Sequence, residues 1–211
     1  MALVPGRRLW PAVAATGLVT GAVSVFPYQG GGGVLHVLGH SAALWLAVAF
    51  GFGAAAGGTR RGAVAGLVSL LAVVVGFYAV MQLVNPGYRV VHTALFWLGA
   101  ALIGGPAYGA IGARWRHGSE RARGVAAAAM GAAFLAESVL FRTPQAVRIG
   151  EGLVGIAVAV ILARRRAPLF AAAAAFPVFL IAGLAGWVLT KYAAHLYFVP
   201  DHFGQPPPPR P

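Results

Sequence analysis

The sequence predicts an all-α fold, a polytopic helical membrane bundle, and three observations lead to it. Of the 211 residues, 59% are hydrophobic and only 9% are charged, whereas a soluble domain carries about 25% charged residues. Apolar segments recur along the chain at about the 20-residue length that crosses a bilayer core. No segment alternates polar and apolar residues as a membrane β-barrel does. We therefore expect about seven transmembrane helices.

Turn signals and basic loops separate the seven expected spans. The first span runs from the basic pair at 7–8 to a Pro- and Gly-rich turn at 27–33, and the second runs from that turn to the basic pair at 60–61. The third ends at a second turn, 85–87. A cleaved signal peptide is the alternative for the first span. The spans lie at 9–26, 34–56, 62–84, 90–112, 122–141, 147–163 and 168–191.

Charged loops bound the remaining spans. The fourth ends at the basic loop 114–123, and the fifth runs from that loop to Arg142. The sixth ends at the arginine triplet 164–166, which the seventh follows as far as Lys191. An outside-to-inside helix, a basic turn and a small-residue helix then recur, which predicts one helix plus three hairpins. Composition bias is the alternative explanation of this repeat.

The distribution of basic residues predicts the orientation. Eleven of the sixteen Lys and Arg residues fall at one set of helix ends and five at the other. The richer set is cytoplasmic by the positive-inside rule, so the N-terminus lies inside and the C-terminus outside. We expect a single transmembrane domain at 1–198 and a disordered, Pro-rich exterior tail at 199–211.

Several functional classes are excluded by composition and motifs. Orientation in a membrane explains the net charge of +12, so we expect no nucleic acid as a partner. The absence of cysteine excludes disulfides and thiolate metal sites. No phosphate-binding loop and no serine-hydrolase motif occurs. No cofactor is expected.

Small residues at helical spacing predict close packing between the helices. Four pairs of glycines have the GxxxG spacing: 17 and 21, 53 and 57, 62 and 66, 105 and 109.

Glu137 is the strongest candidate for a functional residue. It lies 14 residues beyond Arg123, about 21 Å along the fifth helix. An ionisable side chain at that depth usually faces the bundle interior and has a function. A structural ion pair with Arg142, Arg148 or Lys191 is the alternative. Because burial opposes the charge, we expect Glu137→Gln to leave thermal stability unchanged or slightly higher and to reduce activity. We expect an outward-facing pocket with these ligand-binding residues: Glu137, Glu151, Trp45, Trp97 and Tyr78 at similar depth, and His40 about a turn higher, near the outer interface.

A histidine site is an alternative on the same side. His36 and His40 are four residues apart on the second span, and His92 lies on the fourth. Imidazoles with this spacing suit a transition metal or haem. No metal-binding signature accompanies them, so the sequence assigns no metal site.

Three blocks carry a resemblance to a known family: residues 45–80, 97–116 and 123–139, the last with Glu137 near its end. Over residues 9–163, the chain resembles small multi-pass membrane proteins of actinobacteria that form a family of unknown function. The resemblance implies a multi-pass protein of the bacterial plasma membrane and implies no activity.

Three functions remain open from the sequence. The first is a small transporter or membrane-embedded substrate-binding component. The second is an intramembrane enzyme that acts on a lipid or isoprenoid, with Glu137 as the acid. The third is a metal or haem redox protein that uses His36 and His40. The expected partners are the lipid bilayer and a small-molecule or lipid ligand, with a second copy or a separate subunit left open.

Overall fold

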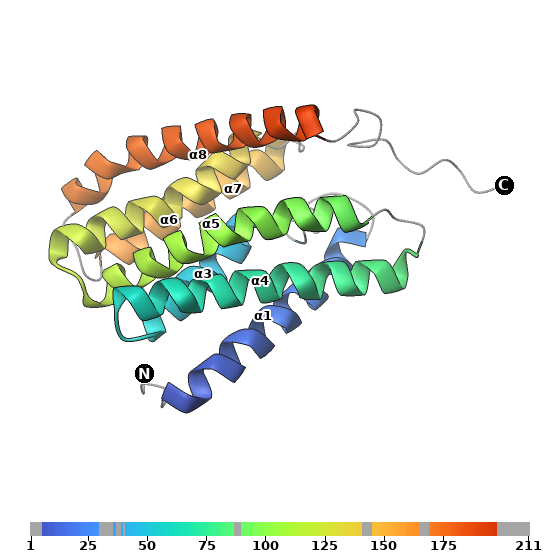
Figure 1. Ribbon diagram of the computed structural model, residues 1–211. Helices are drawn as coiled ribbons and strands as arrows, with labels where there is room; N and C mark the ends of the chain where they lie inside the picture. The colour runs from blue at the N-terminus through green and yellow to red at the C-terminus, as the bar shows by residue number, and fades with distance from the viewer. Residues whose placement is uncertain are drawn as a thin grey trace.

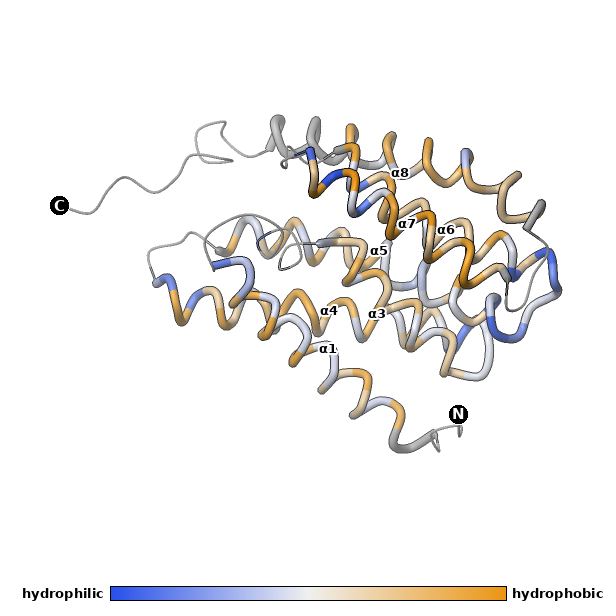
Figure 2. Tube along the Cα trace, turned by 180° about the vertical axis from the view of Figure 1, so that it is seen from behind, coloured by the Kyte–Doolittle hydropathy of each residue, from blue (hydrophilic) through white to orange (hydrophobic). Residues whose placement is uncertain are grey.

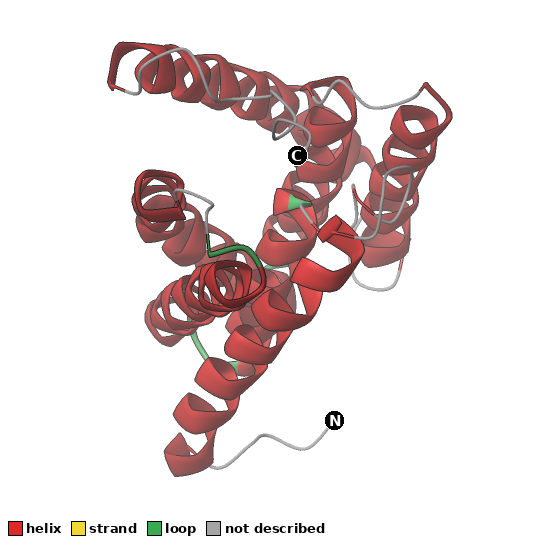
Figure 3. Ribbon diagram, turned by 90° about the vertical axis from the view of Figure 1, so that its right-hand side faces the viewer, coloured by secondary structure: helices red, strands yellow, loops and turns green. Residues whose placement is uncertain are grey.

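The computed structural model describes residues 6–29, 36, 39, 41–86, 90–140, 145–164 and 169–197. Within them the chain forms helices joined by short turns, with no strand (Figure 3). This confirms the all-α expectation, while the predicted tail at 199–211 lies outside the described residues. The helices are α1 (Gly6–Gln29), α3 (Ala42–Ala55), α4 (Thr59–Val84), α5 (Val90–His117), α6 (Glu120–Leu140), α7 (Gln145–Arg164) and α8 (Leu169–Tyr197).

Five of the described helices are long and apolar enough to cross a membrane: Leu9–Gln29, Thr59–Val84, Thr93–His117, Glu120–Val139 and Gln145–Ala163. Two shorter apolar stretches, Ala42–Ala55 and Ala171–Gly186, lie in α3 and α8. The apolar residues run along the helices, and many of them are exposed to the surroundings of the bundle (Figure 2). The bundle is therefore compatible with a membrane protein.

The helices form two groups (Figure 1). Helices α6, α7 and α8 lie together on one side of α3, α4 and α5, and α1 crosses α4 on the opposite side. The most extensive contacts join α4 to α5, α4 to α1 and α6 to α7, whereas α7 and α8 touch little. The packing therefore does not follow the pairs that the predicted hairpins join.

Glycines bring the backbones of α4 and α5 into contact. A Cβ on Gly105 would lie 2.8 Å from the carbonyl oxygen of Gly66, and a Cβ on Gly66 would collide with the carbonyl oxygen of Gly105. Gly62 and Gly109 are equally tight. Helices in lipid pair closely where small residues face each other, so both of these predicted GxxxG pairs are packing contacts.

The other two glycine pairs behave differently from each other. Gly17 and Gly21 press α1 against α4, where a Cβ on Gly17 would lie 2.6 Å from the carbonyl oxygen of Ser69. In the remaining pair, Gly53 meets α5, but Gly57 faces open space with φ +78°. Gly57 thus serves the turn between α3 and α4, because a left-handed backbone costs glycine little.

The second expected span, 34–56, is not one continuous described helix. Helix α3 begins at Ala42, after Ser41 adopts an extended backbone with φ −70° and ψ 110°. The Ser41 hydroxyl accepts the Leu44 N–H, as an N-cap residue does. His36 and Gly39 are also helical, and the residues around them lie outside the described part. A helix start therefore lies where the sequence predicted the interior of a span.

One end of the bundle collects the basic turns, as the blue segments of Figure 2 show. The turns between α3 and α4 and between α5 and α6 meet there, together with the first residues of α8. We call this the basic end; its exposed or half-buried arginines are Arg60, Arg61, Arg114, Arg116, Arg121 and Arg123.

Candidate functional site

The carboxylate of Glu137 lies at the N-terminus of α3. Its Oε2 accepts a hydrogen bond from the Ser41 hydroxyl at 2.9 Å and another from the Ala43 N–H at 2.8 Å. Its Oε1 accepts the Ala42 N–H at 2.9 Å. The Glu137 side chain is only 6% exposed. A residue of α6 thus caps a helix that lies more than 90 residues earlier in the chain.

The local structure explains why this site suits an anion. The first N–H groups of a helix have no partner within the helix, and the helix dipole places partial positive charge there. Ser41 satisfies the Leu44 N–H and still donates its own hydrogen to Glu137. Hydrogen bonds to an ionised acceptor are stronger than neutral ones, so α3 supplies what a buried carboxylate needs.

Cations contribute little around Glu137 in the described part of the structure. No described arginine forms an ion pair with it. Arg148, one turn into α7, instead donates its Nε–H to the Ser138 carbonyl oxygen at 3.0 Å. Among the described residues, the α3 backbone and Ser41 therefore partner this carboxylate, while Arg142 and the side chain of Lys191 lie outside the described part.

Glu151 on α7 is the second acid of the site. It lies beside α6, where its neighbour Gly152 faces Leu135 and Ser138. Its Oε2 is buried and has no hydrogen-bond partner among the described residues. The two acids thus lie on neighbouring helices, α6 and α7, and the expectation that they bind a ligand stays a prediction.

An aromatic cluster lies one turn further along α3. Trp45, 3% exposed, meets the ring of Trp97 edge-on with centroids 5.9 Å apart, and lies 5.3 Å from Phe77. Phe77 in turn contacts Tyr78 at 5.1 Å. Three of the predicted ligand-binding residues thus gather in the core, around a phenylalanine that the sequence analysis missed. The apolar period of α4, with Leu70, Val73, Val74 and Phe77 buried, could have identified it.

The histidines do not assemble a described metal site. The Nδ1–H of His36 donates to the Tyr28 carbonyl oxygen at 2.7 Å, and the two rings stack with centroids 4.6 Å apart. His40 lies outside the described residues, as does the side chain of His92. The described residues contain no group of three or more His, Asp or Glu that could hold a metal.

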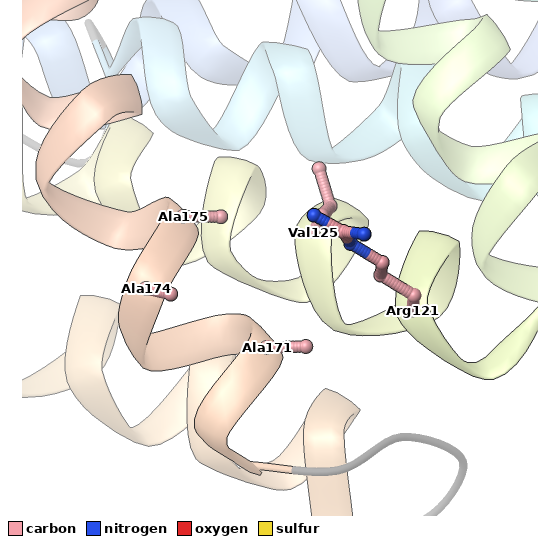
Figure 4. Close-up of a pocket in the computed structure, with 5 residues that line it drawn as sticks. All are labelled: Arg121, Val125, Ala171, Ala174 and Ala175. Carbon is pink, nitrogen blue, oxygen red and sulfur yellow. The ribbon is translucent and has the colours of Figure 1, made fainter.

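A pocket of about 360 Å³ lies at the basic end, between the first turns of α6 and α8. Figure 4 shows three alanine methyl groups of α8 across from two side chains of α6. Its lining residues are Arg121, Val125, Ala171, Ala174 and Ala175. None of the six predicted ligand-binding residues lines this pocket.

The comparisons with known proteins give a family and no activity. The family model described as "Family of unknown function (DUF6518)" matches residues 5–193. No curated protein and no solved structure matches the chain. The match supports the resemblance to a family of unknown function and extends it beyond residues 9–163.

Proposed function

The chain belongs to this family of unknown function, and we propose that it is a small transporter of a bacterial plasma membrane. In this proposal the bundle spans the bilayer several times, with the basic end in the cytoplasm. The junction of Glu137 with α3 is its substrate-binding or ion-coupling centre.

One observation carries the proposal: the buried carboxylate of Glu137 holds the start of α3, inside the segment 34–56 that the sequence predicted as one span. An acid at membrane depth costs about 2.5–3.5 kcal/mol on insertion scales and usually marks an ion or substrate pathway. Secondary transporters place their sites at discontinuous helices whose N-termini point at anionic groups. Here the chain's own carboxylate takes that position.

The neighbours of this junction support the same function. Glu151 adds a second carboxyl group with a buried, unpartnered oxygen in the described structure. Trp45 links the capped start of α3 to the aromatic cluster with Phe77 and Trp97. A cation or an amine is the solute that suits two carboxyl groups beside aromatic rings.

The hydrogen bonds favour transport over intramembrane catalysis. Both oxygens of Glu137 already accept bonds from α3 or Ser41. A general acid must have its proton within reach of the substrate, and a carboxylate turned toward a helix start is better placed to control that helix.

Proteoliposomes of the full chain test the proposal. Currents on a solid-supported membrane are recorded for alkali cations, amines, amino acids and carboxylates, with and without a pH gradient. We expect a solute-dependent current that Glu137→Gln abolishes and that Glu120→Gln, an exposed acid in the first turn of α6, preserves. Ser41→Ala, which removes one bond and keeps the charge, should change the rate. Folded wild-type protein without any such current, or an unaffected Glu137→Gln variant, contradicts the proposal.

A further inference from the structure

We propose that the pocket between α6 and α8 binds an anionic phospholipid, with its phosphate at Arg121 and one acyl chain against the alanines of α8. The proposal rests on the bundle lying in a bilayer and does not depend on transport or on Glu137.

The charged and apolar parts of the pocket lining have the same order as those of a phospholipid. Arg121 is the second residue of α6 and is exposed at the basic end. Val125 lies one turn further into the bundle, and three alanines form the opposite wall (Figure 4). A phospholipid has the same order, with a charged phosphate at the surface and an apolar chain beneath it. A soluble protein or a free anion does not need the apolar part.

The apolar surface continues beyond the pocket along α8. Ala174 is exposed, and Val178 and Ile181 are each 65% exposed. Positions four and seven residues on from Ala174 lie on the same face of a helix, so these three residues form one strip. The strip runs about 10 Å toward the centre of the bundle, the direction that an acyl chain takes.

Charge selects the kind of lipid. The basic end carries Arg60, Arg61, Arg114 and Arg116 on α4 and α5, and the acid at this end is Glu120. Arg121 adds a guanidinium to the lining of the pocket. Guanidinium groups bind phosphate through paired hydrogen bonds. Basic pockets between membrane helices on the cytoplasmic side bind anionic headgroups. Phosphatidylglycerol therefore fits better than the zwitterionic phosphatidylcholine.

The size of the pocket agrees with partial burial of one chain. Its volume of about 360 Å³ is at the lower end of the range for small-molecule sites, about 300–1,000 Å³. The rest of the lipid then remains in the bilayer beside α8.

Native mass spectrometry of the full chain tests this proposal, with equal amounts of phosphatidylglycerol and phosphatidylcholine in the micelles. We expect the wild type to retain phosphatidylglycerol preferentially. Arg121→Gln should lower that retention about fivefold, the effect of one basic residue near an anionic surface. Ala174→Phe should also lower it by filling the pocket, while the unfolding temperature without lipid stays unchanged because Ala174 is exposed.

Arg60→Gln is the matched control, since Arg60 is exposed at the same end but lies outside the pocket. Equal losses in Arg121→Gln and Arg60→Gln would mean a general attraction to the basic end and would overturn the proposal. Protection from heat by inorganic phosphate as strong as that by phosphatidylglycerol would assign the site to a free anion. A dimer that Ala174→Phe converts to a monomer would assign this face of α8 to a second copy of the chain. Either of these two results would overturn the lipid proposal.

Discussion

The Glu137 carboxylate accepts the Ser41 hydroxyl hydrogen at 2.9 Å, across 96 positions of sequence. Ser41 meanwhile accepts the Leu44 N–H, so the cap of α3 is built from one residue of its own segment and one residue of α6. The start of α3 is therefore held in place by another helix. Substitution of either Ser41 or Glu137 should alter the hydrogen bonds of the other.

Glu137→Gln should lower the free energy of unfolding by about 1–3 kcal/mol, the cost of leaving buried donors unsatisfied. The glutamine amide keeps one acceptor oxygen and turns an NH₂ group toward donors. Thermal unfolding of detergent-solubilised protein measures the loss. Glu120→Gln, an exposed acid of the same helix, should stay within about 0.5 kcal/mol of the wild type. Equal stability of the two variants would show that the cap contributes nothing.

Ser41→Ala should cost less, about 0.5–2 kcal/mol as for other N-caps, because Ala42 and Ala43 still donate to Glu137. Amide hydrogen exchange should accelerate at Leu44, whose N–H loses its acceptor. In a double-mutant cycle with Glu137→Gln, the two losses should not add, since both variants break the same contact. Full additivity would mean that the hydroxyl and the carboxylate act independently.

Gly109→Ala should destabilise the bundle by about 1–3 kcal/mol through overpacking. A Cβ at this position collides with the Gly62 carbonyl oxygen and lies 2.9 Å from the Gly66 Cα. Gly99→Ala on the same helix is the control, because a Cβ there meets nothing within 4 Å and alanine favours a helix. The unfolding temperatures should fall for the first variant and hold or rise for the second.

Trp97→Leu should reduce stability and the near-ultraviolet circular dichroism of the aromatic cluster. It removes the edge-on contact with Trp45 at 5.9 Å, worth about 0.5–1.5 kcal/mol beyond the buried area. Trp10→Leu should change little, because Trp10 is 37% exposed on α1. An unchanged near-ultraviolet spectrum in Trp97→Leu would contradict a rigid cluster.

Cysteine labelling tests the proposed orientation in a chain without native cysteine. Thr59→Cys lies at the start of α4 and Gln145→Cys at the start of α7, both exposed. In intact cells an impermeant maleimide should label Gln145→Cys and leave Thr59→Cys unlabelled until the cells are opened. The reverse labelling pattern would show that the bundle has the opposite orientation in the membrane.

The sequence predicted the helices well because hydrophobic length and basic loops are local signals. It also singled out Glu137 as a candidate, since an acid inside an apolar segment stands out by itself, and the ligand-binding role of Glu137 stays a prediction. The hydrogen-bond partners of Glu137 could not be predicted from the sequence, because a cap supplied by another helix depends on how α3 and α6 pack. For the same reason, the expectation of an unchanged or slightly higher stability for Glu137→Gln is replaced by an expected loss.

The start of α3 and the pocket at Arg121 differ in the signal that each carries in the sequence. The start of α3 did carry a local signal, a serine directly before an apolar run, which the predicted span 34–56 passed over. The pocket at Arg121 carried none, because its walls come from α6 and from α8 about 50 positions later in the chain. Alanines on one helix face say nothing about whether the opposite helix is close or leaves a space.

The two helix groups are joined by a different kind of contact from the one that holds each group together. Within a group, glycine brings backbone against backbone, as at Gly66 with Gly105 and at Gly131 with Gly155. Between the groups, the polar links run through side chains: Glu137 to α3, the Tyr108 hydroxyl to the Ala129 carbonyl oxygen at 3.3 Å and the Trp115 indole to the Leu162 carbonyl oxygen at 3.2 Å. Side chains can change rotamer without unfolding a helix, whereas touching backbones cannot separate without opening the core. A buried cluster of Phe50, Met130 and Phe134 also packs across this boundary. Any rearrangement between the two groups would therefore repack side chains along the boundary that Glu137 spans, and it could leave the glycine contacts within each group intact.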